Sequence, residues 1–317
     1  MDIYELWEAK RRGKFTLKHW VWAWLISTRA VALPWVALYT LFGCLLAGVK
    51  DPVAALGAVL TVCFTLLASH FRNNYRDVEL GIDRYVDDPG EAEKVVSTLK
   101  PYTAAAWLVP LRITSVGFQK ANEALFLGLS AAAYALMVLP GHPETLPLYA
   151  LGVFMAESYT DWWKRWRLGE AAAFLGHGFS TVAFGYLSQS NDVLAAVLAG
   201  VVPGVISAFA YSIDQIIDLR ETDFIERVRS IYEAWFRSRL PLGLYMLAFV
   251  MFYYHLLTVF VILGVYPRGV LLTYTLIPLY LFVSAQVEYD RERGLRTAAV
   301  TTVILLPLLM CLGVLIS

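Results

Sequence analysis

Long apolar runs alternate along the chain with short segments rich in charge, glycine and proline. An α-helix needs roughly 20 predominantly apolar residues to cross the hydrocarbon core of a bilayer. Nine runs approach or exceed this length, and each is bounded by residues that typically end helices. We therefore predict an all-α protein with nine membrane-spanning helices, at residues 20–47, 53–71, 115–140, 146–163, 170–189, 192–213, 241–264, 268–287 and 295–316.

One more apolar run, Tyr102 to Leu111, is too short to cross. We interpret it as an interfacial or re-entrant segment. If it instead joined Ile113 to Gln119 as a tenth span, the topology of everything after it would invert. The distribution of charge decides between these alternatives.

In the nine-span arrangement, Lys and Arg gather at the N-terminus and in the loops of one side. Those loops hold residues 72–120, 164–167, 220–239 and 291–296. The opposite side has only Lys50 and Arg268, and Arg29 lies inside the first span. Cytoplasmic loops carry the excess of Lys and Arg. We therefore predict a multi-pass protein of the cell membrane, with the N-terminus and the two long loops cytoplasmic and the C-terminus outside.

Composition agrees with this interpretation. Hydrophobic residues make up 58% of the 317 residues and charged residues only 16%, whereas soluble domains carry about a quarter. No long polar linker divides the chain, so residues 1–317 are expected to form a single domain in the bilayer. The formal net charge of zero excludes a strongly basic surface for nucleic acid.

Two clusters of acids follow predicted spans. In the first, Asn73 and Asp77 share a helix face. Asp83 follows Gly81, which allows the chain to turn back so that a third oxygen joins the first two. The second cluster follows the sixth predicted span and contains Asp214, Asp218 and Asp223.

Such oxygen ligands, with no cysteine partner, suit Mg²⁺, which binds one or two carboxylates plus phosphate oxygens and water. The alternative is that these are solvated acids at helix ends. In that case they pair with Arg72, Arg76, Arg84 and Arg220. Two clusters at corresponding positions favour a site, because ionisable groups near membrane depth are costly. The sequence therefore indicates a Mg²⁺–diphosphate site that opens into an apolar bundle.

The pattern N-x-x-x-D-x-x-x-G-x-D from Asn73 to Asp83 resembles the first aspartate-rich motif of the UbiA superfamily of intramembrane prenyltransferases. It is most similar to the MenA-like branch, which prenylates dihydroxynaphthoate in menaquinone synthesis. Three further segments resemble that branch in the same order: STRAVALPW, RITSVGFQKA and LGEAAAFLGHGF. The span from Asp214 to Asp218 falls where the second motif belongs, so the resemblance covers nearly the whole chain.

The second motif departs from the branch, which usually shows N-N-x-R-D-x-x-x-D and then G-K-x-T-L. Asp214 stands at the first Asn and Ile217 at the Arg, while Asp223 lies one residue beyond the expected acid. The G-K-x-T-L stretch is replaced by residues 224–239, which are predicted to form an amphipathic helix on the membrane. These departures leave the acceptor open. The alternatives are a UbiA-type terpene cyclase, a prenyltransferase with a lipid-glycerol acceptor, and a non-enzymatic transporter or scaffold.

The resemblance implies transfer of a polyprenyl group from a polyprenyl diphosphate to an aromatic or other small acceptor, with Mg²⁺ as cofactor. Its implied metal ligands are Asn73, Asp77, Asp83, Asp214, Asp218 and Asp223, with Asp77 and Asp218 as the catalytic pair. The candidate diphosphate donors are Arg76, Arg84, Lys94, Lys100 and Lys164. Arg29 is expected to meet an anionic acceptor, to snorkel to the membrane interface, or to pair with Glu157 or Asp161. His177 is expected to be a core histidine with its hydrogen bonds satisfied.

Overall fold

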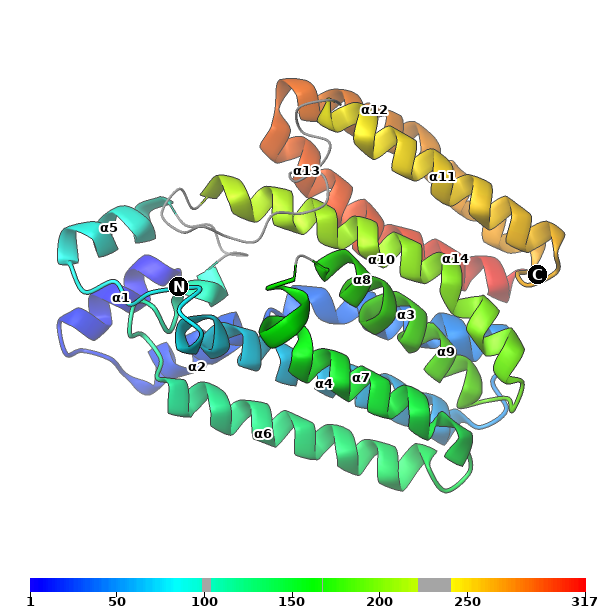
Figure 1. The fold of residues 1–317 in the computed structure, drawn as a ribbon, viewed down its shortest axis with the longest axis horizontal. Coiled ribbons are helices and arrows are strands. Elements are labelled where there is room, and N and C mark those ends of the chain that lie inside the picture. Colours follow the sequence, from blue (N-terminus) through cyan, green and yellow to red (C-terminus); the bar gives the residue numbers. More distant parts are fainter. Residues whose placement is uncertain (99–103, 167, 222–240) are drawn as a thin grey trace.

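A computed structural model describes residues 1–98, 104–166, 168–221 and 241–317 (Figure 1). For residues 98, 104, 214–221, 291 and 292 it describes the backbone alone. Every regular element in these ranges is helical. The α-helices are α1 (Ile3–Arg11), α2 (Leu17–Thr28), α3 (Leu33–Leu46), α4 (Pro52–Glu79), α5 (Pro89–Thr98), α6 (Val116–Ala133), α7 (Leu146–Ser158), α8 (Gly169–Ala173), α9 (Ser180–Leu187), α10 (Val193–Glu221), α11 (Leu242–Ile262), α12 (Ile277–Tyr289), α13 (Arg291–Val300) and α14 (Leu306–Leu315). Short 3₁₀ segments are η1 (Ala30–Ala32), η2 (Ala104–Trp107), η4 (Pro143–Thr145) and η8 (Arg268–Leu276), and π-helical turns are η3 (Tyr134–Val138), η5 (Tyr159–Trp163), η6 (Phe174–Phe179) and η9 (Thr301–Leu305).

Within the described ranges, seven helices are long and apolar enough to cross a membrane. They are Leu17–Leu46, Pro52–Glu79, Val116–Val138, Val193–Ile213, Leu242–Ile262, Arg268–Tyr289 and Arg293–Leu315. These match seven of the nine predicted spans. The other two predicted spans, 146–163 and 170–189, are also helical, as α7 with η5 and as α8, η6 and α9. Both contain acidic residues and are not among the seven, so the count of nine stays a prediction.

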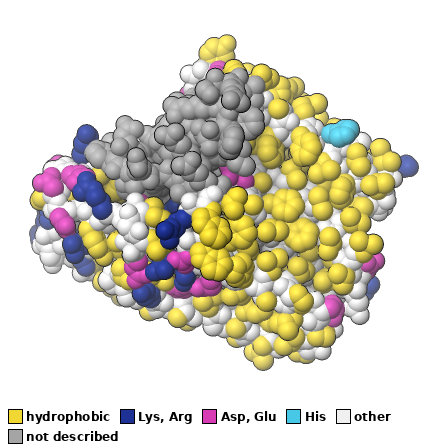
Figure 2. Space-filling view, viewed as in Figure 1, with side chains coloured by type: hydrophobic (Ala, Val, Ile, Leu, Met, Phe, Trp, Pro, Cys, Tyr) yellow, Lys and Arg dark blue, Asp and Glu magenta, His cyan; other side chains and the backbone are white. Residues whose placement is uncertain are grey.

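The helices lie side by side in an elongated bundle, with the N- and C-termini near opposite ends (Figure 1). Charged side chains gather at the end where α1 and α5 lie, whereas hydrophobic side chains cover most of the remaining face (Figure 2). A protein whose side wall contacts lipid needs this distribution, because charge is costly in hydrocarbon. The cytoplasmic orientation of the charged end stays a prediction.

The first span is broken near its start. Arg29 adopts the left-handed conformation, with φ 46° and ψ 44°, between α2 and η1. Pro34 follows in the first turn of α3, where its missing N–H costs no helical hydrogen bond. The predicted span 20–47 is therefore two helices joined at Arg29, rather than one continuous helix.

Helices α3 and α9 pack backbone against backbone. A Cβ atom at Gly43 would lie 2.1 Å from the carbonyl oxygen of Val182, and one at Gly185 would lie 2.1 Å from that of Thr40. Small residues allow such close helix approach in membranes. The contact fixes α3 beside the helix that continues from η6, and so brings Trp35 of α3 to His177 of η6.

A second, smaller core lies at the charged end. It joins α1, α5 and the segment 104–113 through Leu6, Val95, Trp107 and Leu108, all nearly inaccessible to solvent. Residues 104–111 are thus buried against other parts of the protein, and their interpretation as an interfacial or re-entrant segment stays a prediction. The segment is apolar because it fills the interior of this small cap. The amphipathic helix predicted at 224–239 lies outside the described residues.

Candidate active site

The first acid cluster lies at the end of α4. The helix stops after Glu79, and Gly81 turns the chain with φ 70°. The backbone amides of Ile82 and Asp83 then donate to the carbonyl oxygen of Asp77, at 2.8 and 3.0 Å. The turn expected at Gly81 is present and returns Asp83 to Asp77. Both acids are 3% exposed.

Lys164 follows the π-helical turn η5 and reaches this cluster. Its Nζ donates to Oδ2 of Asp77 at 2.6 Å, and Thr160 Oγ1 donates to Oδ1 of Asn73 at 3.0 Å. The second carboxylate oxygen of Asp77, Oδ1, is buried and has no hydrogen-bond partner among the described residues. A buried carboxylate oxygen left unpaired in this way is unusual in proteins.

That unpaired oxygen fits a hard cation. In the described part of the chain, no group of three His, Cys, Asp or Glu side chains is placed to hold a metal. Mg²⁺ usually takes only one or two carboxylates from the protein and completes its shell with water and phosphate oxygens. Asp77, with the amide oxygen of Asn73 close by on the same helix face, is compatible with such a site.

The second cluster is described only in its backbone. Asp214 and Asp218 lie in the last turns of α10, their side chains outside the description, and Asp223 lies outside the described residues. Both α4 and α10 end on the side of the bundle where α1 and α5 lie (Figure 1). The roles of Asp214, Asp218 and Asp223 stay predictions.

The predicted diphosphate donors are in different places. Lys164 is buried against Asp77, whereas Arg76 is held by Asp161 at 2.7 Å and by Glu79 at 2.8 Å. Arg84 is exposed and pairs with Glu91. Lys94 lies exposed on α5, and Lys100 is outside the described residues. Lys164 thus contacts a motif acid directly, through Asp77.

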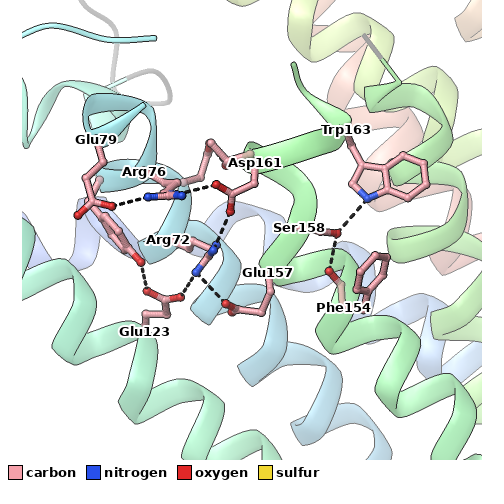
Figure 3. A network of polar contacts seen from close by, with 12 residues as sticks. Arg72, Arg76, Glu79, Glu123, Phe154, Glu157, Ser158, Asp161 and Trp163 are labelled. Carbon is pink, nitrogen blue, oxygen red and sulfur yellow. Dashed lines mark hydrogen bonds and ion pairs between the residues drawn. The ribbon is translucent and has the colours of Figure 1, made fainter. Parts of the chain in front are cut away.

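Arg72, next to the motif, lies at the centre of a network of ion pairs (Figure 3). Its Nη1 contacts Glu123 at 2.9 Å and Glu157 at 2.8 Å, and its Nη2 contacts Asp161 at 2.7 Å. These partners come from α6, α7 and η5, so one guanidinium ties α4 to its neighbours. Tyr75 adds a hydrogen bond from its hydroxyl to Glu123 at 2.7 Å.

Asp161 is shared by two arginines, because Arg76 Nε also donates to it at 2.7 Å. Asp161 lies in η5, outside the seven candidate spans. The guanidinium groups of Arg72 and Arg76 both donate hydrogen bonds to this carboxylate and balance its charge. The same turn carries Thr160 and, one residue beyond its end, Lys164. The network therefore fixes the turn that brings these two side chains to Asn73 and Asp77.

In the alternative interpretation of the first cluster, its acids are solvated and form ion pairs with Arg72, Arg76 and Arg84. The structure instead pairs these arginines with Glu79, Glu91, Glu123, Glu157 and Asp161. The sequence analysis did not foresee this network. A signal was present, since Glu157 and Asp161 are four residues apart on one helix face, as are Arg72 and Arg76 on α4.

Arg29 faces the same end of α4 from inside the bundle. Its Nη2 donates to Oδ1 of Asn74 at 3.2 Å. The expected alternative partners, Glu157 and Asp161, are taken by Arg72, so that pairing is wrong. His177 stacks on Trp35 with ring centroids 5.2 Å apart, and its Nδ1 is buried without a partner in the described part of the chain. His177 is therefore not the satisfied core histidine that was expected.

No family model matches the sequence, and no curated protein matches it. Among solved structures, the chain is similar to one described as digeranylgeranylglyceryl phosphate synthase in membranes. The TM-score is 0.59 at 14% sequence identity, and the alignment covers 94% of this chain and 99% of that one. At this identity the likeness shows a shared fold, and it extends over nearly the full length of both chains.

Proposed function

We propose that this protein is an intramembrane prenyltransferase of the UbiA superfamily that uses Mg²⁺ and a polyprenyl diphosphate. The observation that carries the proposal is Asp77, a buried carboxylate with one oxygen unpaired and the other bound to Lys164. It lies at the polar end of an apolar helix. A prenyl diphosphate needs such a position, because its diphosphate is charged while its prenyl chain lies in the membrane. The fold shared with a prenyl-lipid synthase supports the same assignment.

In this reaction the bond between C1 of the prenyl chain and the diphosphate oxygen breaks, and diphosphate leaves with the electron pair. The acceptor forms a new bond to C1 and loses a proton. Lys164 is placed to donate to the departing oxygens, because cationic donors that face developing charge lower the barrier. Mg²⁺, held by Asn73 and Asp77 and by the acids of the second motif, would supply further positive charge to the leaving group.

The acceptor proposed from the sequence is an aromatic quinone precursor. A lipid-glycerol acceptor is the second candidate, because the solved structure with this fold is described as a digeranylgeranylglyceryl phosphate synthase. An enzyme with either acceptor would have the same diphosphate site, and only the acceptor head group bound beside it would differ.

The test is to incubate purified protein with Mg²⁺ and a radiolabelled prenyl diphosphate, with an aromatic hydroxy acid, with a glyceryl ether phosphate, or with no acceptor. We expect prenylated product with one acceptor class and none in an Asp77→Ala variant. Release of diphosphate without any acceptor would instead assign a cyclase or a hydrolase. No turnover of the prenyl diphosphate under any condition would refute the proposal.

A further inference from the structure

The chain from Tyr159 to Glu170, described except at residue 167, contacts both helices that carry an acid cluster. On the side of α4, Thr160 donates to Asn73 at 3.0 Å and Lys164 donates to Asp77 at 2.6 Å. The two ends of the same connecting segment contact α10, in the turn before the second cluster. The segment therefore joins α4 to α10 at the polar end of the bundle.

Both ends of the connecting segment contact Tyr211 of α10. The hydroxyl of Tyr159 donates to that of Tyr211 at 2.8 Å, and the two rings meet edge to face with centroids 6.1 Å apart. Gly169, the first residue of α8, lies so close to the ring of Tyr211 that a Cβ atom would overlap it. Glycine thus lets α8 approach α10 directly, as small residues do between membrane helices.

Glu170, the second residue of α8, binds the next residue of α10. Oγ of Ser212 donates to Oε1 of Glu170 at 3.0 Å, and the hydroxyl of Tyr245 in α11 donates to Oγ of Ser212 at 3.4 Å. Glu170 is only 7% exposed. A carboxylate inside a membrane bundle is costly and usually has a specific task. A hydrogen bond to a charged acceptor is also about twice as strong as one between neutral groups.

We propose that Glu170 is a positioning residue, which fixes α10 with its acids Asp214 and Asp218 at a set separation from the end of α4. Glu170 can do so because its own segment is bound to α4 through Thr160 and Lys164. Mg²⁺ demands near-ideal octahedral geometry, so ligands on two helices must be held at a fixed distance. This role rests on the proposed function, because a metal diphosphate is what requires both clusters together.

The separation of the two helix ends can be measured without metal or substrate. Spin labels are placed at Leu80, directly after α4, and at Arg220, in the last turn of α10. Double electron–electron resonance is then recorded in nanodiscs, with the native cysteines replaced by alanine. We expect Glu170→Met and Ser212→Ala each to shift or broaden the distance distribution, because each removes one partner of the same hydrogen bond. Either variant suffices if the other does not fold.

Glu170→Gln tests whether the acceptor oxygen is what matters. Glutamine retains an oxygen that can accept from Ser212. We therefore expect Glu170→Gln to give a distance distribution close to that of the unmodified protein.

Mn²⁺ with inorganic diphosphate probes the shared site directly, since Mn²⁺ accepts the same oxygen ligands as Mg²⁺. Electron paramagnetic resonance of Mn²⁺ gives its Kd. We expect Glu170→Met to raise this Kd about tenfold, the size of a lost hydrogen bond to a charged group. Prenyl transfer at saturating Mg²⁺ should retain its kcat, because the metal ligands themselves are unchanged.

Tyr280→Phe is the matched control. It removes a buried hydrogen bond of 3.0 Å between the hydroxyls of Tyr280 in α12 and Thr302 in η9. It should leave the separation and the Kd for Mn²⁺ unchanged. An equal change in this control would overturn the positioning role, because any loosening of the bundle would then produce the effect.

An unchanged separation in both Glu170→Met and Ser212→Ala would also overturn the positioning role. A changed separation, with no binding of Mn²⁺ and diphosphate to the unmodified protein, would keep Glu170 as the residue that holds α10 and refute the proposed function. Binding of Mn²⁺ and diphosphate with an unchanged separation would do the reverse.

Discussion

The ammonium group of Lys164 lies 2.6 Å from Oδ2 of Asp77, and the two side chains are only 9% and 5% exposed. The pair joins the end of α7 and η5 to the end of α4. It also holds one cation beside the carboxylate on which the proposed chemistry depends. Each side chain therefore stabilises the fold and also takes part in the proposed chemistry. Single and double variants can separate these two roles.

Lys164→Met should destabilise the protein by about 3–5 kcal/mol, because it leaves a buried carboxylate without its partner. The double variant Asp77→Asn/Lys164→Met should regain most of that loss, since no uncompensated charge remains. Neither variant should transfer prenyl groups. Denaturant unfolding and diphosphate release, measured on the same preparations, check both parts. Full recovery of activity in the double variant would remove the pair from the mechanism.

Arg72→Met should be among the most destabilising substitutions in the chain. It leaves Glu123, Glu157 and part of Asp161 uncompensated in a largely buried place, and breaking such a network costs about 3–5 kcal/mol. Arg12→Met, at an exposed i,i+4 pair with Glu8, should change stability by less than about 0.5 kcal/mol. Equal unfolding free energies for the two variants would show that the network contributes no stability.

Gly81→Ala tests the turn that returns Asp83 to Asp77. A left-handed alanine costs roughly 1–2 kcal/mol, and relaxation of the turn should displace the Asp83 amide and lower turnover. Gly13 has a similar φ of 67° and, like Gly81, no neighbouring atom within 4 Å of the point where a Cβ would lie. Gly13→Ala should thus cost similar stability without loss of turnover. The measurement is kcat for the two variants, and equal kcat values would contradict the prediction.

Membrane orientation is tested by single cysteines at Asp87 and Arg268, both exposed. The native cysteines are replaced by alanine in the background. A membrane-impermeant maleimide added to intact cells should label position 268 and spare position 87 until the cells are opened. Labelling of position 87 from outside would invert the predicted topology, and Ser230→Cys offers a second position on the same predicted side.

The sequence predicted the helical bundle because the signal for a membrane helix is local: a sufficient run of apolar residues. It also placed Asn73, Asp77 and the Gly81 turn, since those follow from helix periodicity and one permissive residue. It did not predict the break at Arg29, where His70 and Asn74 of α4 bind the carbonyl oxygens of Thr28 and Ser27 just before the break. Nor did it explain residues 104–111, which share a core with residues far away in sequence, such as Leu6 in α1.

Arg76 shows the same limit of prediction from local sequence within the candidate site. Its position next to Asp77 suggested a diphosphate donor, but Asp161, 85 residues further along the chain, binds its guanidinium. Spacing along one helix identifies which residues share a face. It does not say which charges a neighbouring helix brings, and those decide whether an arginine is available to a ligand.

The small core at the charged end has a consequence for the order of synthesis. Helix α1 is synthesised before α5 and Trp107, with which it shares this core, and two candidate spans lie between them in the sequence. Until then only α2 can cover the apolar face of α1, with Leu6 and Trp7, and the membrane interface is the nearest other apolar phase. We therefore expect α1 to rest on lipid while the first spans insert, and to exchange that contact for a protein contact once α5 and residues 104–113 have been made. Substitutions in this cap would slow maturation of the chain more than they weaken the finished bundle.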